Sequence, residues 1–255
     1  MKKLFKNYLN WKIIFTLLVI VTLVFIVGKN EEEGVVNVFS ETKRLPIYNV
    51  ERDDKKIAIS FDAAYGDEYT LDILETLDKY DIKTTFFLVE FWADKFPHQV
   101  KEIYERGHEI GNHSATHPNM SELSREQMAK ELNDTGDKIE EIIGEKPILF
   151  RPPYGDYNNA VIEVAEENDY YTIQWDIDSL DWKELGVEPV VDKVVRDVSS
   201  GSIVLFHNNA KYVKDYLPLV LEGLIEEGFE IVPISELIHK DNYEMNNNGT
   251  QIPIK

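Results

Sequence analysis

The chain has 255 residues, 43% of them hydrophobic, which is enough to form one sizeable core. Its formal net charge of -20 argues against a nucleic-acid ligand, because phosphate binding requires lysine and arginine side chains clustered on one face. The sequence contains no cysteine, which excludes disulfide bonds, a thiol nucleophile and a cysteine-based zinc site. We therefore expect one globular domain, a monomer, in which any metal ion is held by His, Asp or Glu.

The N-terminal residues 1–29 are predicted to form a short cytoplasmic stub and a transmembrane anchor. Four lysines precede an almost unbroken apolar run over residues 13–27, and three glutamates follow it. The run approaches the ~20 residues that span a bilayer, and its basic side should stay in the cytoplasm. A cleaved signal peptide is the alternative, but residues 25–28 lack a small-x-small cleavage pattern. Either interpretation places the rest of the chain outside the cytoplasm, and the anchor predicts a single-pass protein of the cell membrane.

The remainder of the chain divides into three segments. Residues 30–54 mix charges with short apolar pieces, as in a linker that leads into an edge strand. Residues 55–240 are predicted to form the globular domain. Residues 241–255 are polar and contain the run Asn246-Asn247-Asn248-Gly249, so this tail is predicted to be disordered.

Within the domain, short apolar runs alternate with longer amphipathic stretches, which is the pattern of successive β-α units around a parallel sheet. Ser124 and Gln127 resemble a capping box at the start of a helix that should end at Gly144. The predicted strands cover residues 57–61, 84–89, 109–111, 148–150, 170–175, 202–206 and 230–233. Seven strands of this kind predict an α/β fold with a barrel.

Polar side chains directly follow several of the predicted strands. In a parallel barrel, catalytic groups gather at the carboxyl ends of the strands. Five chemically capable residues occupy such positions: Asp62, His113, Arg151, Asp178 and His207. We therefore expect these residues to converge on one rim of the barrel.

Histidines and aspartates of this set could supply the chemistry. His113 and His117 are four residues apart, so on a helix they would project from one face and could chelate one metal ion, although either could be an ordinary surface or core residue. The Asp62 carboxylate would face the mouth of the barrel; a helix cap or a salt bridge is the structural alternative. His207 ends an apolar strand, and pairing with Asp181 would keep its ring protonated and oriented as a general acid.

Two further segments carry candidate functional side chains. In residues 151–155, two prolines fix a turn, and Arg151 could hold a carboxylate by a two-point contact or belong to a merely structural turn. Residues 175–182 combine three acids with two indoles, a combination typical of sugar-binding surfaces. Trp175 itself is expected in the core.

Taken together, these motifs resemble a known family. The resemblance lies in Ser60-Phe61-Asp62, His113-x-x-x-His117, Arg151-Pro152-Pro153-Tyr154-Gly155, Asp178-x-x-Asp181-Trp182 and Leu205-x-His207. In this order, over about residues 50 to 240, the motifs are similar to those of the polysaccharide deacetylase family, also called carbohydrate esterase family 4 or NodB-like, and of its sporulation-associated and peptidoglycan deacetylase branch. The resemblance implies a distorted (β/α)7 barrel and metal-assisted hydrolysis of N-acetyl groups on amino sugars of a cell-wall polysaccharide, either peptidoglycan or a chitin-like oligomer.

The resemblance also implies a role for each motif residue. The catalytic set would be Asp62 as general base and His207 as general acid. Arg151 would position Asp62, and Asp181 would position His207. The metal ligands would be His113 and His117. The substrate-binding residues would be Tyr154, whose backbone amide completes an oxyanion hole, together with Pro152, Trp182 and Leu205.

One position departs from the family pattern. The family usually has two consecutive aspartates in its first motif, the second a metal ligand, but here that place is Ala63. The expected cofactor is a divalent metal, zinc first and cobalt or manganese as alternatives, bound weakly by two imidazoles plus water or substrate. Asp67 or Glu68 could reach back to the ion, although a helix N-terminus suits both better. The missing ligand leaves two other functions open, an inactive wall-glycan-binding protein and an O-acetyl esterase.

Overall fold

The computed structural model describes residues 43–254. The predicted transmembrane anchor and residues 30–42 of the predicted linker therefore lie outside the described residues. Between residues 43 and 254, no helix is both long enough and apolar enough to cross a bilayer. The described end of the linker contains the short strand β1 (Asn49–Val50), which agrees with the predicted edge strand.

A parallel sheet of eight strands forms the centre of the domain. Its strands are β2 (Lys56–Ala63), β3 (Thr85–Leu88), β4 (Glu109–Asn112), β5 (Leu149–Phe150), β6 (Tyr171–Thr172), β7 (Ile177–Asp178), β8 (Ile203–His207) and β9 (Glu230–Ile231). Seven of them follow the order β6-β5-β4-β3-β2-β8-β7, and β9 pairs with β2. Because all these pairings are parallel, the strands end on one edge of the sheet.

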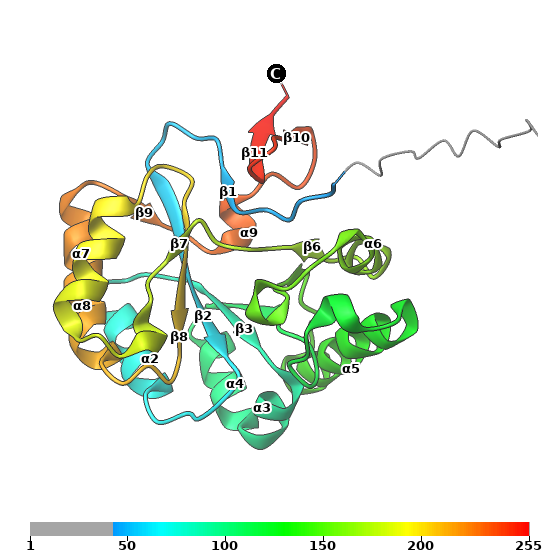
Figure 1. Cartoon of the computed structure of the whole chain (residues 1–255). Coiled ribbons are helices and arrows are strands. Elements are labelled where there is room, and N and C mark those ends of the chain that lie inside the picture. The colour runs from blue at the N-terminus through cyan, green and yellow to red at the C-terminus, as the bar shows by residue number, and fades with distance from the viewer. Residues whose placement is uncertain (1–42, 255) are drawn as a thin grey trace, which may run out of the picture. The chain divides into compact units, whose positions relative to one another are not determined.

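Helices lie around the outside of this curved sheet (Figure 1). They are α2 (Thr70–Lys79), α3 (Glu90–Lys95), α4 (Pro97–Glu105), α5 (Arg125–Ile143), α6 (Asn159–Glu167), α7 (Val187–Asp197) and α8 (Val213–Glu226). The short helix α9 (Ile234–Leu237) packs instead against the inner face of the sheet. Isolated bridges join Ile47 to Ile173, after β6, and Asn49 to Ser202, before β8. The domain is therefore an α/β half-barrel of parallel strands, and the segment before β2 links its two sides.

The central strand β2 divides its side chains between two faces, because successive residues of a strand point to opposite sides. Phe61 belongs to the large core cluster shared with the helices, and its ring stacks on Phe86 at 5.1 Å and on Phe206 at 5.6 Å. Ala58 packs in a second cluster on the other face. Asp62 is four residues after Ala58 and therefore lies on the same face of β2. Its carboxylate points into the half-barrel rather than toward the helices.

Most of the predicted elements are confirmed. Each of the seven predicted strand segments overlaps a strand of the structure. The capping box is formed, since Ser124 and Gln127 each accept a hydrogen bond from the other's backbone N–H, and Gly144 ends α5 with a φ of 82°. Strand β7 was not predicted because it lies in an acid-rich segment.

The prediction of a disordered tail is wrong for residues 241–254. Strands β10 (Tyr243–Met245) and β11 (Thr250–Pro253) form an antiparallel hairpin, and β11 also pairs with β1. Asn246 Oδ1 accepts hydrogen bonds from the backbone N–H groups two and four residues further along. Gly249 has a φ of 79°, in the left-handed region that favours glycine. The asparagine-rich run is therefore a hairpin turn, although its composition resembles that of a flexible segment.

Candidate active site

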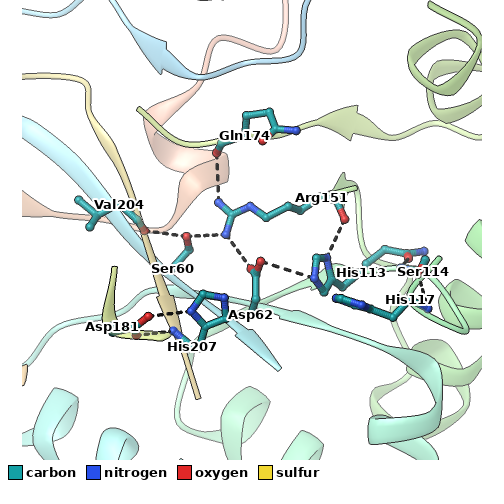
Figure 2. Close-up of polar contacts among 11 residues, drawn as sticks. Ser60, Asp62, His113, Ser114, His117, Arg151, Gln174, Asp181, Val204 and His207 are labelled. Carbon is teal, nitrogen blue, oxygen red and sulfur yellow. Dashed lines mark hydrogen bonds and ion pairs between the residues drawn. The ribbon is translucent and has the colours of Figure 1, made fainter. Parts of the chain in front are cut away.

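Strand register brings Asp62 to the middle of the carboxyl edge. On β2, Asp62 is the partner of His207 on β8 and of Phe87 on β3. His113 and Arg151 directly follow β4 and β5, the next strands on the β3 side. Figure 2 shows the Asp62 carboxylate between the imidazole rings of His113 and His207. The structure therefore brings together four of the five polar groups that the strand pattern placed on one rim.

Arg151 holds Asp62 from a fully buried position. Its Nη1 donates to Asp62 Oδ1 at 2.7 Å and to Ser60 Oγ at 2.9 Å, and its Nη2 donates to the Gln174 carbonyl at 3.2 Å (Figure 2). The predicted two-point contact with one carboxylate is wrong, because the second nitrogen is taken by the Gln174 carbonyl. This arrangement leaves Asp62 Oδ2 facing His113 Nε2, at 3.5 Å.

A glycine on β4 makes room for the ring that supports Arg151. The guanidinium lies over the Phe87 ring, 4.1 Å from its centroid. A Cβ placed on Gly111 would be only 2.5 Å from that same ring. Any larger residue at this position would displace Phe87, and with it the surface on which the guanidinium rests.

Opposing influences set the charge of Asp62. Burial raises the pKa of Asp62. The charge of Arg151, the neighbouring His113 and His207, and the hydrogen bond from Arg151 together outweigh burial, so the pKa lies below its ordinary value. Asp62 is therefore a carboxylate at neutral pH. A carboxylate with one oxygen held by Arg151 and the other directed at the centre of the site has the form required of a general base.

The two histidines expected to bind metal lie in a loop, so the helical spacing considered for residues 113–117 does not apply. Ser114 and His117 have φ values of 68° and 58°, which no helix allows. The backbone N–H groups of Ala115 and Thr116 donate to the Glu131 carboxylate of α5 rather than to a helical turn. The loop still brings the two imidazole rings together, with centroids 5.0 Å apart.

Both imidazoles are held in the neutral form. Burial lowers the pKa of His113. Burial, and to a smaller extent the neighbouring His113, lowers the pKa of His117 to about 4. His113 Nδ1 lies 2.7 Å from the Arg151 carbonyl, so this nitrogen carries the proton and Nε2 keeps its lone pair. His117 Nδ1 is buried and has no hydrogen-bond partner within the described part of the chain. Neutral rings with free lone pairs are what a metal ion requires.

The donor set is nevertheless incomplete for a metal centre. In residues 43–254, no group of three or more His, Asp or Glu side chains is positioned to hold a metal ion. Ala63 is fully buried in the apolar cluster, and the Asp67 carboxylate accepts from Gln99 at 3.3 Å. Catalytic zinc sites normally have three protein ligands. The residues present, His113 and His117, therefore do not fit a metal centre of that kind.

His207 and Asp181 form a tightly bonded pair on the other side of Asp62. His207 Nδ1 lies 2.8 Å from Asp181 Oδ1, and the His207 backbone N–H donates to Asp181 Oδ2 at 2.8 Å. Burial lowers the pKa of His207, but the hydrogen bond and the charge of Asp181 outweigh burial and raise it above its ordinary value. The ring is thereby kept protonated and oriented, which suits a general acid.

The other acids of residues 175–182 have structural contacts. Asp178 Oδ1 accepts from the Leu180 N–H at 2.9 Å and so caps the turn that delivers Asp181. Asp176 accepts from Asn49, from Ser202 and from the Ile203 N–H, which ties β8 to the segment before it. Asp178 is the last residue of β7, so it lies at the carboxyl end of a strand, but its carboxylate organises the turn and leaves Asp181 as the acid that contacts His207.

Tyr216 on α8 is a site residue that the motifs did not indicate. Its hydroxyl donates to Asp181 Oδ2 at 2.8 Å, and its ring stacks on Phe206 at 5.6 Å. The available signal was a tyrosine on the apolar face of a helix, because a buried hydroxyl needs a partner. The position of that partner depends on tertiary packing.

Tyr216→Phe is expected to lower the free energy of unfolding by about 1–3 kcal/mol, because a buried carboxylate loses one of its donors. Chemical denaturation of the full chain would measure this loss. Tyr65→Phe, which removes an exposed hydroxyl, serves as the control and should leave the unfolding free energy unchanged. Equal stability of Tyr216→Phe and the wild type would show that the hydroxyl does not stabilise Asp181.

The four predicted substrate-binding residues divide into two groups. Tyr154, with a φ of 59°, is 67% exposed and lies edge-on to His117 with ring centroids 4.5 Å apart, and Trp182 is 55% exposed. Pro152 and Leu205 are buried. The side chains available to a glycan are therefore those of Tyr154 and Trp182.

The sequence and the fold match known proteins. A polysaccharide deacetylase family model matches residues 49–173. A peptidoglycan-N-acetylglucosamine deacetylase of Bacillus cereus is 37% identical over 196 residues, which cover 75% of this chain and 92% of the relative. An uncharacterized protein of Bacillus subtilis, YlxY, is 33% identical over 193 residues, covering 76% of this chain and 60% of that protein.

The solved structures add a further comparison. A pseudoenzyme of carbohydrate esterase family 4 from Bacillus anthracis matches with a TM-score of 0.74 and 34% identity, covering 76% of this chain and 69% of that chain. A mutant of this pseudoenzyme with restored enzymatic activity matches with a TM-score of 0.74 and 35% identity, covering 76% and 71%. These similarities in sequence, fold and ordered motifs show that the chain belongs to the polysaccharide deacetylase family, carbohydrate esterase family 4.

Proposed function

We propose that this protein removes N-acetyl groups from the amino sugars of a cell-wall polysaccharide. The observation that carries the proposal is the position of Asp62 between His113 and His207 (Figure 2). Asp62 has a lowered pKa and His207 a raised one, so a proton acceptor and a proton donor face one point. The similarity to peptidoglycan-N-acetylglucosamine deacetylases supports an acetamido sugar as the substrate.

The proposed reaction needs two proton transfers. Asp62 takes a proton from water as the water oxygen bonds to the acetamide carbon, and the backbone N–H of Tyr154 is available to stabilise the oxyanion. His207 then gives its proton to the sugar nitrogen as the C–N bond breaks, which releases acetate and leaves the amine on the sugar. Each positioned acid or base typically contributes about 10²- to 10⁴-fold.

Deacetylases of this family generally depend on a divalent metal ion, which polarises the acetamide carbonyl. Within residues 43–254, the protein ligands to zinc, cobalt or manganese would be His113 and His117. Because this pair does not make a three-ligand centre, the proposed steps rest on Asp62 and His207.

Acetate release by the purified full chain tests the proposal. The substrates are a β-linked N-acetylglucosamine oligomer and peptidoglycan, each with and without zinc, cobalt or manganese. Acetate release above the background of the Asp62→Asn variant supports the deacetylase. Acetylated xylan in a parallel assay would reveal an O-acetyl esterase instead.

A second function is favoured by the buried Ala63 and by the similarity to a pseudoenzyme. It is a wall-glycan-binding protein without turnover. Binding of the oligomer without acetate release, even with excess metal, would support this function and reject the first.

Asp181→Asn should shift the pH dependence of the reaction. His207 acts as an acid only when protonated, so activity is lost as the pH rises through the His207 pKa. Burial lowers that pKa and Asp181 raises it, so loss of the Asp181 charge is expected to lower the pKa of His207. The alkaline limb of the kcat/KM profile is therefore expected at lower pH in the variant. An unmoved limb with a reduced kcat would contradict the role of Asp181 in holding the proton on His207.

We also propose that the domain acts outside the cytoplasm, held to the cell membrane by residues 13–27. The support is the basic segment before that apolar run and the acidic segment after it. Protease added to intact spheroplasts should digest the domain, whereas protection until the membrane is opened would reject this location.

A further inference from the structure

We propose that Tyr65 and Phe91 form a saccharide subsite for the sugar next to the one that loses its acetyl group. This inference rests on the proposed function and extends it to the length of glycan that the protein recognises. The Tyr65 side chain is 59% exposed and that of Phe91 36% exposed, although both are large and apolar. Their ring centroids are 5.8 Å apart, so the two rings make one continuous exposed surface. An exposed aromatic pair of this kind, next to the proposed active site, is available to contact the apolar face of a sugar.

The Tyr65–Phe91 surface continues into the proposed active site. The Tyr65 ring lies 6.1 Å from the His117 ring, and the His117 ring lies 4.5 Å from that of Tyr154. A row of four rings thus runs from Phe91 on α3 to the turn after β5. His117 belongs to the centre of the site, so a sugar resting on Tyr65 would be adjacent to the sugar at Asp62.

Hydrogen bonds anchor the backbone next to Tyr65. The carbonyl of the next residue, Gly66, accepts from Trp92 Nε1 at 2.6 Å and from Asn208 Nδ2 at 2.9 Å. Trp92 is buried in the core and is the neighbour of Phe91 on α3. One core side chain therefore links the loop that carries Tyr65 to the helix that carries Phe91. A ring held exposed in this way binds a ligand without first paying the entropy of ordering a loop.

The chemistry of these rings selects a sugar. A pyranose has an apolar face of C–H groups that covers an aromatic ring, while its hydroxyl groups stay in water or reach the tyrosine hydroxyl. Trp182 offers a second exposed ring beyond Asp181, on the His207 side of Asp62. Aromatic surfaces on both sides of the reactive groups suit a chain of sugars that crosses the site.

Calorimetric titration of the full chain, kept in a detergent without a sugar headgroup, tests the subsite. The ligands are the β-1,4-linked tetramer of N-acetylglucosamine and the monomer. Tyr65→Ala and Phe91→Ala should each weaken tetramer binding by about 10-fold, the size expected when one sugar face loses its apolar contact, and should leave monomer binding unchanged. Tyr65→Phe keeps the ring and should retain tetramer affinity. Leu219→Ala, which truncates an exposed apolar residue on α8, is the matched control.

The outcomes separate this inference from the proposed function. Unchanged tetramer affinity in both alanine variants overturns the subsite, whether or not acetate is released. Weakened tetramer binding in these variants without any acetate release by the wild type supports the subsite and rejects the deacetylase. A wild type that binds no tetramer overturns both. Both rings are exposed, so their truncation should leave the fold intact.

Discussion

Asp62→Asn is expected to reduce acetate release by about 10²- to 10⁴-fold, the usual contribution of a positioned general base. Asparagine has the same shape and its Oδ1 can still accept from Arg151, so the geometry of the site is preserved. Its amide cannot take a proton from water. The measurement is acetate release per folded molecule, with the oligomer at saturation.

The buried charge of Arg151 complicates this variant, because the arginine loses its ionic partner. Breaking a buried pair costs about 3–5 kcal/mol, so the folded fraction must be measured alongside activity. Asp176→Asn is a matched control, since Asp176 is also a largely buried and hydrogen-bonded carboxylate but ties β8 to its neighbouring segment. A folded Asp62→Asn protein with the wild-type rate would remove Asp62 from the mechanism.

Ala63→Asp is expected to increase both bound metal and acetate release. The new carboxylate would directly follow Asp62, whose Oδ2 already lies 3.5 Å from His113 Nε2, and would add a third protein ligand to two neutral imidazoles. The related pseudoenzyme that a mutation restored to activity shows that a fold of this family can regain catalysis. Metal content by mass spectrometry and acetate release, each against the wild type, measure the two gains.

The burial of Ala63 sets the control for this experiment. A charge at a fully buried position destabilises the fold unless a cation compensates for it, so the variant should be more stable with zinc than without zinc. Ala63→Asn has nearly the same volume and no charge, so it reproduces the packing change alone. If Ala63→Asp binds no more metal than Ala63→Asn, its carboxylate lies on the helix side of β2 and does not reach the two imidazoles.

The position of the reactive residues was predictable because strands leave a regular signal. The apolar residues 57–61 mark β2, and parallel strands place the residues that follow them on one edge. Asp62, His113, Arg151 and His207 were found by that rule. The rule predicts which edge of the sheet a residue lies on but not what its side chain contacts. It therefore also selected Asp178, whose carboxylate caps a turn.

Loop conformation and long-range partners were not predictable, because distant side chains decide them. The spacing of His113 and His117 fits a helix, but Glu131 on α5 takes the backbone donors of that segment. Tyr216 meets Asp181 only because α8 packs against the turn that carries the acid. The asparagine-rich run near the end of the chain resembles a disordered tail in composition, and its hairpin exists because β11 finds β1 as a partner.

The pairing of β11 with β1 bears on the order of events during synthesis. The ribosome delivers β1 before the parallel sheet and β11 after it, so these two strands can meet only once nearly the whole domain has been translated. Contacts between such remote segments form late, since their loop must close first. A polypeptide that stopped before residue 243 would keep every reactive group of the site, yet the edge of β1 that pairs with β11 would be left open to association with other chains.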